Sequence, residues 1–408
     1  MTIHEFKSPI PVVTPLGDGY AIYVKSNGIL ENDEWCVTLC EGGRVYHFLS
    51  DQIKIFHNQT YGIKKNTMTI FITGGAGLLG SNLCHWLLEN TDHKVVAIDD
   101  LSGGYVENLP ELSERFHFRD FDINNTQVLE YNFKYYNPDI VYHFAAYAAE
   151  CVSPFIRKFN YTNNLLSTAS VINCCIKSKV KRLIFTSSMS VYGNSIPPFD
   201  EEMVCHPIDP YGVAKYACEM DIQIAGEQHG LDWCIIRPHN VYGIRQNIWD
   251  SYRNVIGIFM YKALCGDPLT VYGDGMQKRA FSEINDILEP LYVAGTSEKA
   301  NKQIINLGGV KEHTINEVAN YVAVLGDAEI IYLPPRHEVK IAYSTHEKSE
   351  QLLNFKHKTG LYEGIQNMWE WAKQQPKRPR FVWKDYEINE GLYAYWQPEN
   401  LKDGYYKK

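Results

Sequence analysis

Thr73-Gly74-Gly75-Ala76-Gly77-Leu78-Leu79-Gly80 lies between an apolar run at residues 69–72 and an apolar-periodic segment at residues 82–88. This order predicts a strand, a glycine turn and a helix. Gly74, Gly77 and Gly80 permit a tight turn, the close approach of a pyrophosphate, and close packing of helix on strand. The phosphates would bind free amides at the helix N-terminus, where the helix dipole favours negative charge. The stretch therefore predicts a dinucleotide-binding turn.

A second apolar run, at residues 94–98, ends in Asp99 and Asp100, about twenty residues past the glycines. An acid at this place accepts hydrogen bonds from the hydroxyls of the adenosine ribose and repels a 2′-phosphate. The sequence therefore predicts NAD as the cofactor rather than NADP.

The composition is that of a soluble globular protein. Of the 408 residues, 45% are hydrophobic and 21% are charged. The formal net charge of −9 gives no sign of a nucleic-acid-binding surface. No apolar stretch is long enough to span a membrane, and no signal peptide begins the chain, so we expect a cytoplasmic location. The ten cysteines show no metal-like spacing, which indicates buried thiols and no bound metal.

Strand-like and helix-like segments alternate over residues 68–240. The strands are expected at residues 69–72, 94–98, 116–118, 139–145, 182–187 and 233–237. Such alternation predicts an α/β fold with a Rossmann-type, doubly wound parallel sheet. Residues 241–375 are less regular, and we expect them to form a smaller substrate-binding part, with some interleaving between the two.

The two ends of the chain differ from this pattern. Residues 1–67 contain β-rich runs at 20–25, 35–39, 44–48 and 52–56, which predict a small barrel or curled sheet. This added domain either packs on the main body of the protein or builds an oligomer interface, or it has a separate ligand- or partner-binding role. The tail, residues 376–408, is rich in aromatic residues with acids among them. We expect it to dock onto its own chain or a second copy, and not to bind nucleic acid.

Tyr211 and Lys215 are four residues apart, so they lie on one face of a predicted helix. A cation beside a phenol favours the phenolate and lowers its pKa, which suits the phenol to act as a base. The run Thr186-Ser187-Ser188 ends an apolar strand, where ligands bind in parallel sheets. A hydroxyl there can bridge the substrate and the phenolate.

Residues 68 to about 373 resemble an extended short-chain dehydrogenase/reductase of the NAD-dependent nucleotide-sugar epimerase/dehydratase family. The matching motifs follow the order of the family: TGGAGLLG (73–80), HFAA (143–146), TSSMSVYG (186–193), YGVAK (211–215), RPHNVYG (237–243), GDGMQKRAF (273–281) and INLGG (305–309). Two departures are Ala148, where the relatives place a lysine near the cofactor, and His239, which replaces an aromatic residue.

The resemblance implies a role for each matching residue. Ser188, Tyr211 and Lys215 would be catalytic, with Lys215 also holding the nicotinamide ribose. NAD would be bound by Gly74, Gly77, Leu78, Leu79, Gly80, Asp99, Asp100, Asp122, Ile123, Phe144, Ala145, Ala146 and Asn164. The substrate would be bound by Ser188, Ser190, Asn240, Asn254 and Val255, with Tyr272 stacking on the base and Arg279 and Arg336 clamping the phosphates. Tyr343 would close the space that an N-acetyl group needs.

Met189 and Ser190 indicate which reaction of the family to expect. Related dehydratases and decarboxylases carry acids at these places, and neither residue here can replace one, so we expect epimerisation. The most direct case is 4-epimerisation of a UDP-hexose, without an N-acetyl group, through a transient 4-keto intermediate. The alternatives are epimerisation at another carbon or on another nucleotide, as in CDP-sugar 2-epimerases, or a non-catalytic NAD-binding scaffold. The family expectation for assembly is a homodimer through two helices of the Rossmann part.

Overall fold

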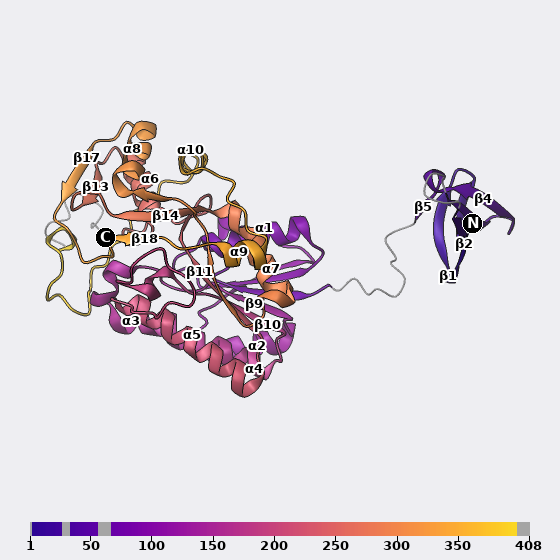
Figure 1. The fold of residues 1–408 in the computed structure, drawn as a ribbon, viewed down its shortest axis with the longest axis horizontal. Coiled ribbons are helices and arrows are strands. Elements are labelled where there is room, and N and C mark those ends of the chain that lie inside the picture. The colour runs from indigo at the N-terminus through magenta and orange to yellow at the C-terminus, as the bar shows by residue number, and fades with distance from the viewer. Residues whose placement is uncertain (1, 27–32, 56–66, 398–408) are drawn as a thin grey trace. The chain divides into compact units, whose positions relative to one another are not determined.

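The computed structural model describes residues 2–26, 33–55 and 67–397. The chain forms two compact units, Met1–Thr67 and Met68–Lys408 (Figure 1). Among the described residues, no helix is long and apolar enough to cross a membrane.

The first unit is a five-stranded antiparallel sheet with the order β4-β3-β2-β1-β5. Its strands are β1 (Thr2–Thr14), β2 (Gly17–Ser26), β3 (Glu34–Leu39), β4 (Val45–Leu49) and β5 (Lys54–Ile55). Val12, Ala21, Val37 and Phe48 alternate inward to form its own small core. No strand was predicted over residues 2–14, where the structure has β1. A register shift between Glu5 and Ile10 separates two regularly paired stretches of this strand.

The second unit is built on a seven-stranded sheet with the order β15-β11-β10-β9-β6-β7-β8, in which every neighbouring pair is parallel. The strands are β6 (Thr69–Thr73), β7 (Lys94–Asp99), β8 (Phe116–Asp120), β9 (Ile140–His143), β10 (Arg182–Thr186), β11 (Trp233–Pro238) and β15 (Gln303–Leu307). The parallel α/β fold predicted from the sequence is therefore confirmed. The order reverses between β6 and β9, and ligands of such sheets bind in the crevice outside the carboxyl ends of the strands at this point.

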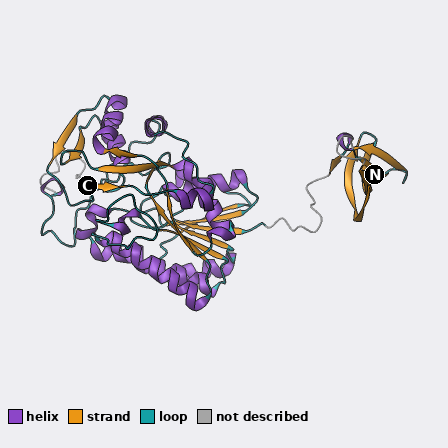
Figure 2. Cartoon of the chain, in the orientation of Figure 1, coloured by secondary structure: helices purple, strands orange, loops and turns teal. Residues whose placement is uncertain are grey.

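Helices cover both faces of the sheet, as Figure 2 shows. On one face, α1 (Leu78–Asn90), α7 (Ile284–Thr296) and α9 (Glu347–Leu353) bury Leu83, Leu291 and Leu353. On the other, α2 (Thr126–Tyr136), α4 (Ser167–Lys177) and α5 (Pro210–His229) bury Phe133, Val171 and Ile222. The strands are buried on both sides, which accounts for their nearly continuous apolar sequences.

The outer part packs three helices against small sheets around a separate core. The helices are α6 (Val255–Cys265), α8 (Ile315–Gly326) and α10 (Leu361–Ala372). The strands are β12 (Asn240–Tyr242), β13 (Leu269–Tyr272), β14 (Lys278–Glu283), β16 (Glu312–Thr314), β17 (Ile330–Leu333) and β18 (Ile341–Ala342). This part is not continuous in sequence, because α7, β15 and α9 return to the Rossmann sheet.

The tail docks onto its own chain. Tyr386, Leu392 and Trp396 are buried against Phe155 and Tyr252 of the second unit. The Glu387 carboxylate accepts hydrogen bonds from the backbone amides of residues 158 and 159, in the short helix α3 (Arg157–Tyr161). The tail therefore takes its core from the body of the protein.

Candidate active site

A cavity of about 970 Å³ opens at the carboxyl ends of the parallel strands. This volume is typical of a site for a large organic ligand. Its walls come from the glycine turn, the ends of β7 to β11, helix α5, the outer part, and residues 380–385 of the tail. The residues predicted to bind cofactor or substrate line it, except Asn164 and Tyr343.

The glycine turn has the shape that a pyrophosphate needs. Gly74 has φ +70°, and a Cβ there would lie 2.7 Å from the amide nitrogen of Ala145, so a side chain has no room. A Cβ on Gly80 would lie 2.2 Å from the carbonyl oxygen of Gly74, which shows how closely α1 packs on the turn. Gly77 is the N-cap of α1 and offers no capping side chain, so the first amides of the helix are open to a phosphate.

Asp99 supports the turn as well as facing the cavity. Its carboxylate accepts hydrogen bonds from the amide of Ala76, at 3.0 Å, and from that of Leu101, at 2.8 Å. Burial raises the pKa of Asp99, and these two hydrogen bonds oppose the rise. Asp100 is exposed and accepts from Ser102. Both carboxylates lie at the end of β7, where a ribose would be held.

Asn164 acts on the cofactor cleft indirectly. It is buried outside the cavity wall, where its amide oxygen accepts from the Tyr147 amide at 2.8 Å and its amide nitrogen donates to the Tyr147 carbonyl at 3.2 Å. These bonds fix the loop that carries Phe144, Ala145 and Ala146 into the cavity.

Ser188, Tyr211 and Lys215 meet in the cavity. Asp209 caps the start of α5 by accepting from the amide of Gly212, and this sets the first turn that carries Tyr211. The Lys215 ammonium donates to the Thr186 carbonyl at 2.7 Å and lies 5.9 Å from the centre of the Tyr211 ring. A side-chain hydrogen bond joins Ser188 and Tyr211.

The expected depression of the Tyr211 pKa by Lys215 is not found. Burial raises the pKa of Tyr211, and the nearby Glu150 carboxylate raises it further. Burial also lowers the pKa of Lys215 to about 8, because its charge is removed from water. The Ser188 hydrogen bond and the charge of Arg253 lower the pKa of Tyr211, but burial has the larger effect and the pKa is raised.

The far end of the cavity holds the predicted nucleotide-binding residues. The Asn240 side chain donates to the Ala280 carbonyl. Asn254 is the N-cap of α6, and Val255 is the first residue of that helix. Arg279 and Arg336 each lie 3.4 Å from the same carboxylate, that of Glu338.

Tyr272 is less open to a base than the sequence suggests. Its ring is contacted by the Arg336 guanidinium, 4.4 Å from the ring centre, and by the ring of Tyr395 at 4.8 Å. A nucleobase that stacks on Tyr272 must therefore share this ring with groups of the protein.

Tyr343 does not line the cavity, although it was expected to restrict the sugar pocket. Side chains of an extended segment alternate in direction, and here Ala342 lines the cavity while the carbonyl of Tyr343 accepts from the amide of Phe199. The argument from Tyr343 against an N-acetyl group therefore has no support in the structure.

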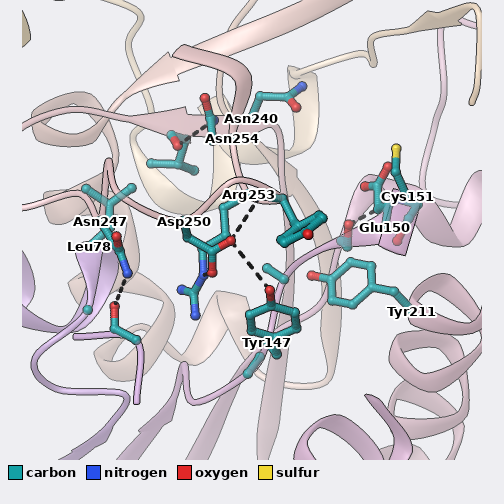
Figure 3. Close-up of a pocket in the computed structure, with 18 of the residues that line it drawn as sticks. Leu78, Tyr147, Glu150, Cys151, Tyr211, Asn240, Asn247, Asp250, Arg253 and Asn254 are labelled. Carbon is teal, nitrogen blue, oxygen red and sulfur yellow. Dashed lines mark hydrogen bonds and ion pairs between the residues drawn. The ribbon is translucent and has the colours of Figure 1, made fainter. Parts of the chain in front are cut away.

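Sequence reasoning also missed several residues of the cavity. The Asp250 carboxylate pairs with Arg253 at 3.0 Å and accepts from the Tyr147 hydroxyl at 3.5 Å (Figure 3). The Trp383 indole in turn donates to the Tyr147 hydroxyl at 3.1 Å. Glu150 follows β9, and ligand-binding residues of parallel sheets lie after the carboxyl ends of strands. This position could have identified Glu150 as a residue of the cavity. A carboxylate is thus present in the cavity, although Met189 and Ser190 supply none.

The structure shows no metal site or disulfide in its described part. No cluster of acids, histidines and cysteines there could hold a metal ion. All ten cysteines are free thiols.

Comparisons with known proteins agree with this geometry. The profile of the NAD dependent epimerase/dehydratase family matches residues 70–308, and this chain belongs to that family. A putative UDP-glucose 4-epimerase of Methanocaldococcus jannaschii is 32% identical over 310 residues, which cover 74% of this chain and 98% of the relative.

Two solved structures are similar to the second unit in fold and sequence. One is the UDP-glucose 4-epimerase of Thermotoga maritima with UDP-glucose, with a TM-score of 0.70 and 30% identity, over 75% of this chain and 99% of the other. Another is the UDP-glucuronic acid 4-epimerase of Bacillus cereus with UDP-glucuronic acid and NAD, with a TM-score of 0.70 and 29% identity over the same shares.

Proposed function

We propose that this protein is an NAD-dependent epimerase that interconverts the C4 epimers of a UDP-hexose. The observation that carries the proposal is the position of Ser188, Tyr211 and Lys215 in a single cavity that continues to Arg279 and Arg336. The uncapped start of α1, the space at Gly74 and the acids at the end of β7 suit the pyrophosphate and ribose of NAD. When bound, NAD supplies the reversible acceptance of a hydride from the sugar.

In this proposal the residues of the chain move protons and hold the ligands. The Tyr211 oxygen takes the proton of the sugar 4-hydroxyl, and the Ser188 hydroxyl shares that hydrogen bond. Lys215 would hold the nicotinamide ribose, and its ammonium lies 5.9 Å from the centre of the Tyr211 ring. The transient 4-keto sugar turns over in the cavity, and Tyr211 then returns the proton. General acid–base catalysis of this type contributes ~10²–10⁴-fold to rate.

Proton NMR in deuterated water tests this function with UDP-galactose, UDP-glucose and a panel of CDP-sugars. Formation of UDP-glucose without deuterium on carbon supports a C4 hydride that is removed and returned. Deuterium at C3, C5 or C6 contradicts it, because it requires loss of a carbon-bound proton. Turnover of only the CDP-sugars contradicts the assignment of the nucleotide.

Replacement of Tyr211 by Phe should abolish turnover and leave NAD bound. Tyr216→Phe, on the same helix but outside the cavity wall, is the matched control and should keep full activity. Full activity of Tyr211→Phe contradicts the mechanism.

We propose in addition that the protein is a cytoplasmic homodimer that pairs through α4 and α5. Val213, Met220 and Ile224 are exposed apolar residues spaced by seven and four along α5, so they share one face. Leu166, just before α4, is exposed as well. Replacement of Met220 and Ile224 by Glu should convert the dimer to a monomer in light scattering.

A further inference from the structure

Glu150 is an acidic side chain inside the cavity with no role in the mechanism above. It begins the short 3-10 helix η3 (Glu150–Phe155) that follows β9, and it is exposed within the cavity. Among the residues that the structure describes, no ion pair to Glu150 is formed. Arg279 and Arg336, whose charges lower the pKa of Glu150, are both paired with Glu338 instead.

The electrostatic neighbours of Glu150 locate it along the path of the substrate. Its charge acts on Tyr211, which would contact C4 of the sugar, and Figure 3 shows the two side chains close together. It also interacts with Arg279 and Arg336, which would hold the diphosphate on C1. A pyranose ring spans the space between its C4 and its C1 phosphate. Glu150 therefore lies beside the ring itself.

The other charged groups near Glu150 do not cancel the negative charge at this end of the cavity. Asp209, at the start of α5, is close enough to raise the pKa of Glu150, and so is Glu338. Each arginine that faces Glu150 is offset by Glu338. The sugar end of the cavity thus presents the Glu150 carboxylate, which can accept hydrogen bonds from hydroxyls and repels a further negative charge.

We propose that Glu150 selects a neutral, hydroxyl-bearing hexose and excludes hexuronates such as UDP-glucuronate. This inference rests on the proposed function, since it assigns the sugar that this site accepts. Two unit charges at roughly 8 Å, at an effective dielectric constant of about 20, change affinity by more than tenfold. The carboxylate of a uronate bound beside Glu150 should meet repulsion of this size.

The test compares kcat/KM for UDP-glucose and UDP-glucuronate in the wild type, Glu150→Gln and Glu130→Gln. Glu130 is an exposed residue on α2 paired with Lys177, outside the cavity, and so is a matched control. At a pH well above 7, where the Glu150 carboxylate is charged, the wild type and the control should prefer UDP-glucose by about tenfold or more. Glu150→Gln should lose most of this preference through better use of UDP-glucuronate. Equal use of both sugars by the wild type overturns the proposal, and so does an unchanged ratio in Glu150→Gln.

The pH dependence gives a second readout that a structural role would not produce. Burial and the neighbouring Asp209 raise the pKa of Glu150 to about 7. The preference of the wild type should therefore weaken as the pH falls through 7 and this carboxylate is neutralised, whereas the ratio in Glu150→Gln should stay flat. A flat wild-type ratio contradicts the proposal.

Binding separates this inference from the proposed function. In the NAD-loaded Tyr211→Phe protein, calorimetry should show tighter binding of UDP-glucose than of UDP-glucuronate, and addition of Glu150→Gln should remove the difference. Absence of UDP-hexose turnover in the wild type contradicts the proposed function. If the affinity difference persists in the variant with Glu150→Gln, the selection by Glu150 is contradicted while the proposed function still stands.

Discussion

The N-terminal unit and the C-terminal tail are both additions to the Rossmann body, and they are stabilised in different ways. Residues 1–67 bury Val12, Val37 and Phe48 against one another in a sheet of their own. The tail buries Tyr386 and Trp396 against residues of the body, and residues 380–385 line the active-site cavity. A segment with its own core places no demand on the catalytic site. A segment whose apolar side chains pack against the body, as those of the tail do, becomes part of the structure around the cavity.

Removal of the tail after Gln375 should have the largest effect on turnover. It takes away one wall of the cavity and exposes Tyr252 and Phe155 to water. We expect kcat/KM to fall by about two orders of magnitude, since positioning of the substrate is worth this much. Steady-state kinetics checks the fall, and retained NAD absorbance on the purified protein is the control. Unchanged kinetics would show that the tail is not part of the site.

Trp383→Ala should have an intermediate effect. It removes the hydrogen bond to Tyr147 and the ring contact with Phe159, at 4.8 Å between centres. Tyr147 then loses one of the groups that hold it beside Asp250 and Arg253. We expect about a tenfold rise in KM and about 2–3 kcal/mol less stability in chemical denaturation. Trp383→Phe, which keeps an aromatic ring, should show a clearly smaller rise; equal effects would exclude a packing role.

Glu387→Gln should have a small effect. Its carboxylate accepts from the backbone amides of Lys158, at 2.7 Å, and Phe159, at 2.8 Å. Loss of the charge should cost about 1 kcal/mol of stability and change KM by about twofold at most. Glu390→Gln, at an exposed position of the same tail, should leave the denaturation midpoint in place. A midpoint that is unchanged in Glu387→Gln would show that this anchor does not stabilise the tail.

Val37→Asp should have the smallest effect on turnover. Val37 is fully buried in the first unit, and an unpaired charge there should unfold this unit. Hydrogen exchange should show loss of protection confined to residues 1–67. We expect kcat and KM to stay within about twofold of the wild type, because the described cavity lining comes from the second unit alone. A collapse of activity would show that the first unit contributes to the site.

Much of the fold and part of the site follow from local sequence. The strand, glycine turn and helix at residues 69–90 lie where the sequence predicts them, because glycine tolerance and apolar periodicity act over a few residues. Strand β1 was not predicted, although it pairs with β2 on both sides of its register shift. The lowered pKa expected for Tyr211 was wrong, because it weighed a neighbouring cation and not burial.

The sequence by itself determined the alternation of strands and helices, the glycine turn before α1 and the shared helix face of Tyr211 and Lys215, since these depend on neighbours within a few residues. Only the tertiary structure decided that Glu150 lines the cavity and that Tyr343 does not. It also decided that Trp383 contacts Tyr147, 236 residues away in the chain. Such pairings depend on how distant segments pack, and no local pattern records them.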